Sequence, residues 1–188
     1  MTLGEGKEKV YMLLDEYSSG GAVTRDDDIA LKMARFFDIA QKHVAQIRRI
    51  RRSFAVERED DVSEYAMPAD FLKLIAVWRD GKRWRGYRWK AGKLIIPEGD
   101  AAETIEIEYF ALPETITDET EDSYEFAVRE EAANALPFFV AAQQLITDLV
   151  IDYAGLYAIY NNMLGLLAQQ EAEESDGGGM LTNTFYRG

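Results

Sequence analysis

The sequence predicts an α+β fold: a mainly α-helical bundle built from the N- and C-terminal segments, with a small antiparallel β lobe inserted between them. Two changes of apolar spacing predict it. The spacing is helical up to residue 47, alternates from about residue 54 to residue 110, and is helical again from about residue 124. Neither helical flank carries a complete apolar core, so we expect both flanks to pack as one bundle.

The predicted organisation places the bundle in residues 1–53 and 122–175, the β lobe in residues 54–121, and a docking arm in residues 176–188. The first helix is short and ends at the SSGG stretch of residues 18–21, because paired glycines permit a sharp turn. A second helix follows, with a continuous apolar stripe that runs from Ile29 to Ile47.

This second helix is expected to finish in the RRIRR stretch, where basic side chains complement the negative end of the helix dipole. The basic cluster at the helix end comprises Arg48, Arg49, Arg51 and Arg52. A DNA contact and a charged helix end at a surface or subunit boundary are both compatible with it.

The β lobe is predicted from two strand patterns and two turn dipeptides. KLIAVWR at residues 73–79 and TIEIEYF at residues 104–110 have the composition and alternation of strands. Asp80-Gly81 is a strong hairpin signal, because both residues tolerate positive φ, and Ala91-Gly92 is a second possible tight turn. We expect residues 73–110 to form a small antiparallel meander.

The C-terminal helical pattern runs to about Glu174, and Pro137 either starts a new helix or kinks a long one. Its apolar stripe is wide enough to predict a helix buried on more than one side. The stripe comprises Leu145, Leu149, Leu156, Tyr160, Leu164 and Leu167, widened by Val150, Tyr153 and Tyr157.

A glycine-hinged tail follows the last helix. Three consecutive glycines permit free movement, and the residues beyond them supply apolar anchors. These anchors, predicted to dock onto a partner subunit, are Met180, Leu181, Phe185 and Tyr186.

Composition argues against an enzyme. The chain of 188 residues has no cysteine and a single histidine, His43, which excludes thiolate chemistry and multi-histidine zinc sites. Asp148 and Asp152, four residues apart, could bind a cation or act in acid-base chemistry, but polar or interface contacts are the preferred interpretation. We therefore expect no catalytic site, no metal and no cofactor, and neither a signal peptide nor a membrane span, as in a protein made in the cytoplasm.

Charge is distributed unevenly along the chain, whose formal net charge is -13. Residues 1–47 carry 6 basic and 8 acidic side chains, residues 48–93 carry 13 and 7, and residues 94–188 carry 2 and 19. A basic middle and an acidic C-terminal half favour oriented pairing with further copies or with a partner.

The stretch KRWRGYRWK at residues 82–90 concentrates the basic and aromatic side chains. It is predicted to contact a neighbouring subunit or a tail protein, since Trp and Arg are enriched in protein interfaces. Contact with a nucleic-acid backbone and ordinary sheet packing are the alternatives. The interface residues are Arg83, Trp84, Arg85, Tyr87, Arg88 and Trp89.

The arrangement resembles the head-tail adaptor, or connector, proteins of tailed bacteriophages, of the tail tubular protein A type. The resemblance rests on the segments SSGGAVTRDDDIALKMARFFDIAQKHVAQI, YAMPADFLKLIAVWRDGK, IEIEYFALPETIT and AANALPFFVAAQQLITDLVIDYAGLYAIYNNML, which together cover most of the chain. These are structural patterns and not chemical fingerprints.

The resemblance implies a non-enzymatic subunit of the virion, located at the head-tail junction. It would form a homo-oligomeric ring of about a dozen copies that joins the portal protein to a tail or nozzle protein. The double-stranded DNA genome would pass through the channel without sequence-specific binding, and no membrane would be involved. The alternative is a nucleic-acid-binding module that uses the RRIRR cluster and the strip at residues 82–90, and a weaker one is a small acid-base enzyme built around Asp148 and Asp152.

Overall fold

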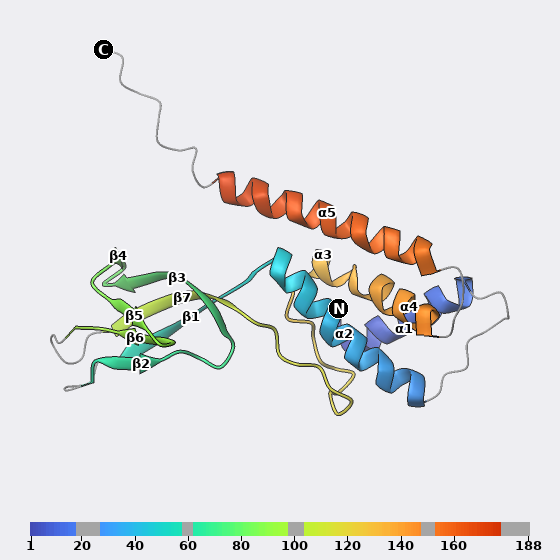
Figure 1. The fold of residues 1–188 in the computed structure, drawn as a ribbon, viewed down its shortest axis with the longest axis horizontal. Coiled ribbons are helices and arrows are strands. Elements are labelled where there is room, and N and C mark those ends of the chain that lie inside the picture. Colours follow the sequence, from blue (N-terminus) through green and yellow to red (C-terminus); the bar gives the residue numbers. More distant parts are fainter. Residues whose placement is uncertain (18–26, 58–61, 98–103, 148–152, 178–188) are drawn as a thin grey trace, which may run out of the picture. The chain divides into compact units, whose positions relative to one another are not determined.

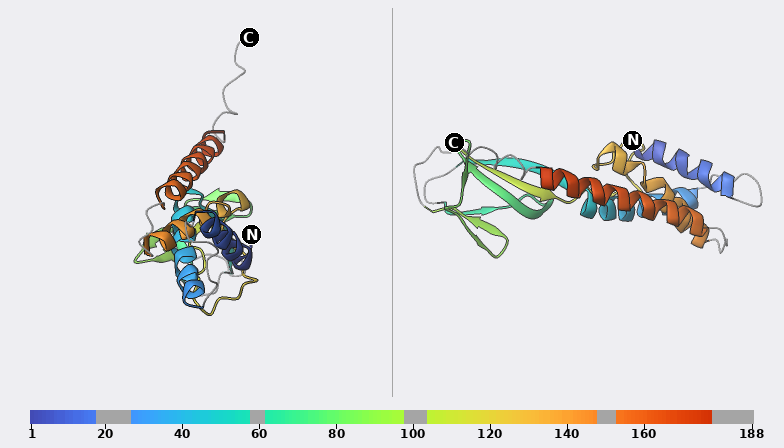
Figure 2. Two further views of the ribbon diagram at one scale, coloured as in Figure 1. Left: turned by 90° about the vertical axis from the view of Figure 1, so that its right-hand side faces the viewer. Right: turned by 90° about the horizontal axis from the view of Figure 1, so that it is seen from above.

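The computed structural model describes residues 1–17, 27–57, 62–97, 104–147 and 153–177; for residues 16, 17, 27–31, 147 and 175–177 it describes the backbone alone. The chain divides into two compact units: a helical unit of residues 1–48 with residue 115 onward, and a β unit of Arg49–Glu114. The predicted α+β class is confirmed: helices from both chain ends pack together, and the antiparallel β segment is inserted between them in the sequence (Figure 1 and Figure 2).

The helical unit consists of α1 (Leu3–Tyr17), α2 (Asp27–Ile47), α3 (Glu130–Ala133), α4 (Leu136–Thr147) and α5 (Tyr153–Gly177). Helix α4 is its centre, since it packs against α1, α2 and α5 (Figure 1). The sequence of α4, LPFFVAAQQLIT, is apolar around its whole circumference and suits this position. Its buried side chains include Leu136, Phe139, Val140 and Leu145.

The segment between β7 and α3 runs along α1 and α2, and polar contacts hold it there. Gln41 of α2 is fully buried; its side-chain carbonyl accepts a hydrogen bond from the backbone N–H of Ala127 (2.9 Å) and its amide donates to the hydroxyl of Tyr124 (3.2 Å). Lys7 of α1 forms an ion pair with Asp122 at 2.6 Å. These contacts hold residues 122–127 as non-helical chain with turns and a single β-bridge, so the helix expected from about Tyr124 begins only at α3.

The β unit holds two antiparallel sheets. The first has the order β1-β7-β3-β4, with β1 (Ile50–Glu57), β7 (Thr104–Ala111), β3 (Phe71–Arg79) and β4 (Lys82–Trp84). The second has the order β2-β6-β5, with β2 (Glu64–Ala66), β6 (Lys93–Ile95) and β5 (Arg88–Lys90). The core of the unit comprises Val56, Val77, Leu94, Ile96, Ile105 and Ile107.

Both predicted turn dipeptides form hairpins. Asp80 and Gly81, which join β3 to β4, have φ of 50° and 70°, and Ala91 and Gly92, which join β5 to β6, have φ of 51° and 77°. Positive φ at both central residues matches the right-handed twist of the flanking strands.

The predicted meander is wrong, because β7 lies between β1 and β3 and the strands divide into two sheets. The predicted start of the β segment is also late: β1 begins at Ile50, inside the RRIRR stretch. Arg51 and Arg52 belong to a strand only because β1 pairs with β7 along its whole length.

Pro137 is the second residue of α4 and starts a helix, which confirms the first of the two positions predicted for it. The single apolar stripe predicted from Leu145 to Leu167 belongs to two helices, α4 and α5. Helix α4 is buried on several sides, whereas α5 buries a single stripe of side chains.

Candidate functional site

The basic aromatic strip of residues 82–90 does not form one strand. Its first part is β4 in the first sheet and its last part is β5 in the second, with residues 85–87 crossing between the sheets. The cause is Gly86: a Cβ at this position would lie 2.5 Å from the indole of Trp84, so the indole lies directly against the glycine backbone.

The aromatic side chains of the strip therefore serve mainly the β unit itself. Trp84 and Tyr87 are half-buried and pack against its core, with ring centroids 6.2 Å apart. Trp89 is 44% exposed and stacks on Phe71 with centroids 5.2 Å apart. Of the six predicted interface residues, Arg83, Arg85, Arg88 and Trp89 are exposed and can reach a partner, as can Lys82 and Lys90 at the ends of the strip.

The outer face of the first sheet mixes aromatic, basic and acidic side chains. The guanidinium groups of Arg49 and Arg51 lie 5.0 and 5.8 Å from the ring centre of Phe110. The indole N–H of Trp78 donates to a carboxylate oxygen of Glu108 (3.4 Å). Carboxylates beside the aromatic groups repel phosphate, so this face is better suited to protein than to a nucleic-acid backbone.

The basic cluster predicted at a helix end is split. Helix α2 ends at Ile47, so only Arg48 adjoins it; Arg51 and Arg52 lie in β1. Arg52 forms an ion pair with Asp70 at 2.6 Å. The prediction that these four arginines form one surface at a helix end is therefore wrong, because an arginine-rich sequence is compatible with a strand as well as with a helix terminus.

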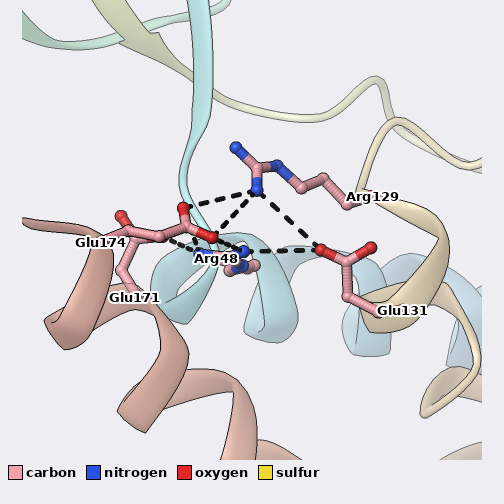
Figure 3. A network of polar contacts seen from close by, with 5 residues as sticks. All are labelled: Arg48, Arg129, Glu131, Glu171 and Glu174. Carbon is pink, nitrogen blue, oxygen red and sulfur yellow. Dashed lines mark hydrogen bonds and ion pairs between the residues drawn. The ribbon is translucent and has the colours of Figure 1, made fainter.

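Arg48 is buried in the helical unit, with 5% of its surface exposed, and holds α5 in place (Figure 3). Its Nη1 donates to Glu171 (2.8 Å), and its two Nη atoms donate to both carboxylate oxygens of Glu174. Glu131 of α3 lies 3.5 Å from Nη2. On the solvent side, Arg129 forms ion pairs with Glu131 and Glu174. We call these five residues the arginine clasp.

The clasp has the electrostatics of a structural contact. Hydrogen bonds to Glu174 raise the pKa of Arg48, and the hydrogen bond from Arg48 lowers the pKa of Glu174. Two carboxylates from α5 thus compensate a buried cation, whose Nε has no hydrogen-bond partner among the described residues. Because the last buried apolar residue of α5 is Leu167, the clasp is what attaches the helix beyond that point.

Helix α5 exposes an unusual amount of uncharged surface. The stretch Tyr153–Gln170 contains no charged residue, although 29% of the chain is charged. Only one stripe of this stretch is buried: Leu156, Tyr160, Leu164 and Leu167. Large side chains beside the stripe are exposed: Tyr153 (39%), Tyr157 (37%), Ile159 (36%) and Leu166 (62%).

An apolar hollow of about 340 Å³ lies beside α5 in the helical unit. Its walls are Met12 and Leu13 of α1, Pro137 and Phe138 of α4, and Met163 of α5. At its edge the ammonium of Lys9 donates to the side-chain carbonyl of Asn134 (3.2 Å). Methionine side chains adapt to irregular partners, so the hollow suits apolar or aromatic groups.

The remaining candidates are His43, the carboxylates and the tail residues. The ring of His43 lies 3.0 Å from the hydroxyl of Tyr160, whose pKa is raised by burial, and this contact joins α2 to α5. Within the described ranges no three histidine, aspartate or glutamate side chains are placed to hold a metal ion. Asp148, Asp152 and the tail residues Met180, Leu181, Phe185 and Tyr186 lie outside the described residues.

Sequence reasoning missed the arginine clasp and the hollow. The hollow depends on the packing of three helices, which no local pattern encodes. The exposed surface of α5 did have a signal, the length of its uncharged run, but the same run also fits a buried helix.

No family model matches the chain, and no curated protein matches it in sequence. Among the described helices, none is both long and apolar enough to cross a membrane. The candidate site is therefore a set of surfaces: the uncharged flanks of α5, the hollow, and the exposed arginines of the β unit.

Proposed function

We propose that this chain is a structural head-tail adaptor of a tailed bacteriophage. Copies of it form a ring that joins the portal to the tail and lines the channel through which the DNA leaves the head. The observation that carries the proposal is the uncharged and largely exposed surface of α5, on a bundle that has the composite α+β organisation expected of this class.

Depletion of charge with exposed Tyr, Met and Leu is typical of the buried part of protein interfaces. A subunit with such a surface is adapted to assembly with other proteins. The exposed carboxylates of the C-terminal half suit a DNA channel, because negative walls repel the duplex and prevent it from adhering.

The alternative of a nucleic-acid-binding module is less well supported. Trp84 and Tyr87 pack on the core of the β unit, Arg48 is buried among carboxylates of the helical unit, and Arg52 is ion-paired with Asp70. Few aromatic faces are thus left for stacking on bases.

The test is particle imaging of the protein mixed with a portal ring. We expect density with the symmetry of the ring beneath the portal. DNA affinity that falls steeply with salt, together with no portal binding, would overturn the proposal in favour of the nucleic-acid module.

A further inference from the structure

We propose that the open edge of β1 pairs with β1 of a second copy, so that two β units join through one continuous antiparallel sheet. The inference goes beyond the proposed function and does not depend on it, because it concerns the β unit alone. The length of the strand shows that the edge can accept a partner, and the order of its side chains identifies that partner as a second copy.

Strand β1 is the long open edge of the β unit. It lies at the end of the first sheet, paired with β7 on one side, and no described strand pairs with its other side. The other edge strands, β2, β4 and β5, have three residues each, and such short edges are protected, whereas β1 has eight residues. Its register with β7 is continuous, without a bulge, and it contains no proline. Such an edge presents backbone N–H and C=O groups to a further strand.

The charges of β1 favour an identical strand in antiparallel orientation. Val56 is buried, so Arg51 and Glu57 lie on the opposite, exposed face of the sheet. The guanidinium of Arg51 lies over the ring of Phe110, and neither Arg51 nor Glu57 has an ion pair within the described part of the chain. With Phe54 of both copies on the two-fold axis, Arg51 of each copy lies opposite Glu57 of the other, which gives two ion pairs. Parallel pairing in register would place Arg51 beside Arg51 and is disfavoured.

The middle of this pairing contains uncharged side chains. On the outer face Ser53 lies opposite Ala55 of the second copy, and both residues are small and exposed. On the inner face Phe54 lies opposite Phe54; its half-buried ring packs on the core of its own unit, and aromatic pairs across two strands are stabilising. The remaining charge of the strand, Arg52, already forms an ion pair with Asp70. The strand is therefore complementary to itself.

The contact has a defined stoichiometry. It uses the same edge of both copies, so it is isologous and stops at the dimer. The pairing covers the open edge of the free protein and prevents further strands from adding to it. A ring of the proposed function needs separate contacts.

Disulfide formation tests the register, because the chain has no cysteine of its own. Full-length Ser53→Cys and Ala55→Cys are oxidised with diamide, each alone and as a mixture, and analysed on a denaturing gel without reductant. We expect the mixture to give a disulfide-linked dimer, since the two positions lie opposite each other. Each variant alone should give much less, because its cysteines are diagonal neighbours. The matched control mixes Ser53→Cys with Ile39→Cys, which is 51% exposed on α2, and should give no such dimer.

Charge reversal tests whether the occupant is a second copy. Arg51→Glu alone and Glu57→Arg alone each place like charges opposite each other twice, so each should associate about tenfold more weakly than the native chain in analytical ultracentrifugation. Mixing the two variants restores two pairs of opposite charge, and native mass spectrometry should detect the heterodimer. Glu106→Arg, which makes the same change of charge on β7 and away from the edge, is the matched control and should still form the dimer. Thermal unfolding verifies that each variant is folded.

Each outcome decides the proposal. A disulfide-linked dimer that is specific to the mixture, together with recovery of the dimer by mixed charge variants, supports it. A monomeric native chain overturns it, and this is the result expected if the edge binds an extended segment of another protein. Equal crosslinking by one cysteine variant alone, or charge variants that associate like the native chain, also overturns it.

Discussion

Gly86 decides how the basic aromatic strip folds, through one contact. An alanine Cβ would lie 2.5 Å from the rigid indole of Trp84, which packs on the core of the β unit. We expect Gly86→Ala to lower the free energy of unfolding by about 1–3 kcal/mol, as overpacking does. Denaturant unfolding measures this free energy. Gly165→Ala is the control, because nothing lies within 4 Å of that position and alanine stabilises a helix by about 1 kcal/mol; equal effects of the two variants would refute the explanation.

Ala91 is the one strained residue of the second hairpin. Its φ of 51° is in the left-handed region, which costs an alanine roughly 1–2 kcal/mol. Ala91→Asn restores the preferred Asn-Gly turn and should raise the free energy of unfolding by about 0.5–1 kcal/mol. Gly92→Ala, at φ of 77°, should lower it. A neutral Ala91→Asn would show that the turn relaxes in solution.

At the scale of elements, the arginine clasp sets the stability of the C-terminal part of α5. Glu171→Gln with Glu174→Gln leaves the buried Arg48 with Glu131, at 3.5 Å, as its remaining carboxylate partner in the clasp and should cost about 1.5–3 kcal/mol. Arg48→Met should cost less, because the carboxylates it leaves behind are partly exposed and remain hydrated. Urea unfolding measures the free energy of unfolding of both variants. A larger loss in Arg48→Met than in the double glutamine variant would contradict the role of the two carboxylates as partners of the buried cation.

The clasp also has a pH dependence with a defined sign. Arg48 lowers the pKa of Glu174 in the folded protein, so folding favours the ionised carboxylate. Its contribution is complete above the ordinary glutamate pKa of about 4.3 and is lost as the pH falls through the lowered value. Below about pH 4, unfolding curves of the native chain and of the double glutamine variant should therefore converge.

Elements defined by local chemistry could be predicted from the sequence, and those defined by distant partners could not. Asp80-Gly81 and Pro137 carry their own backbone preferences and were correctly interpreted. The position of β7 between β1 and β3 depends on pairing across about fifty residues, and Arg51 and Arg52 join a strand only through it. For the same reason the wide apolar stripe predicts a C-terminal helix buried on more than one side, although α5 buries a single stripe and Tyr153 and Tyr157 are partly exposed.

At the scale of the whole molecule, the two units should respond independently to mutation, because each has its own apolar core. The core of the helical unit is built on α4, with Phe37, Val140 and Tyr160 among its buried side chains, whereas Val77 and Ile107 belong to the β unit. We expect Gly86→Ala to lower amide hydrogen-exchange protection in residues 49–114 only, and Arg48→Met to lower it in the helical unit only. Hydrogen exchange measured by mass spectrometry on peptide fragments compares the protection of the two units. If either variant weakened protection equally in both units, the chain would unfold as one cooperative structure, and the separate apolar cores would not make the two units independent.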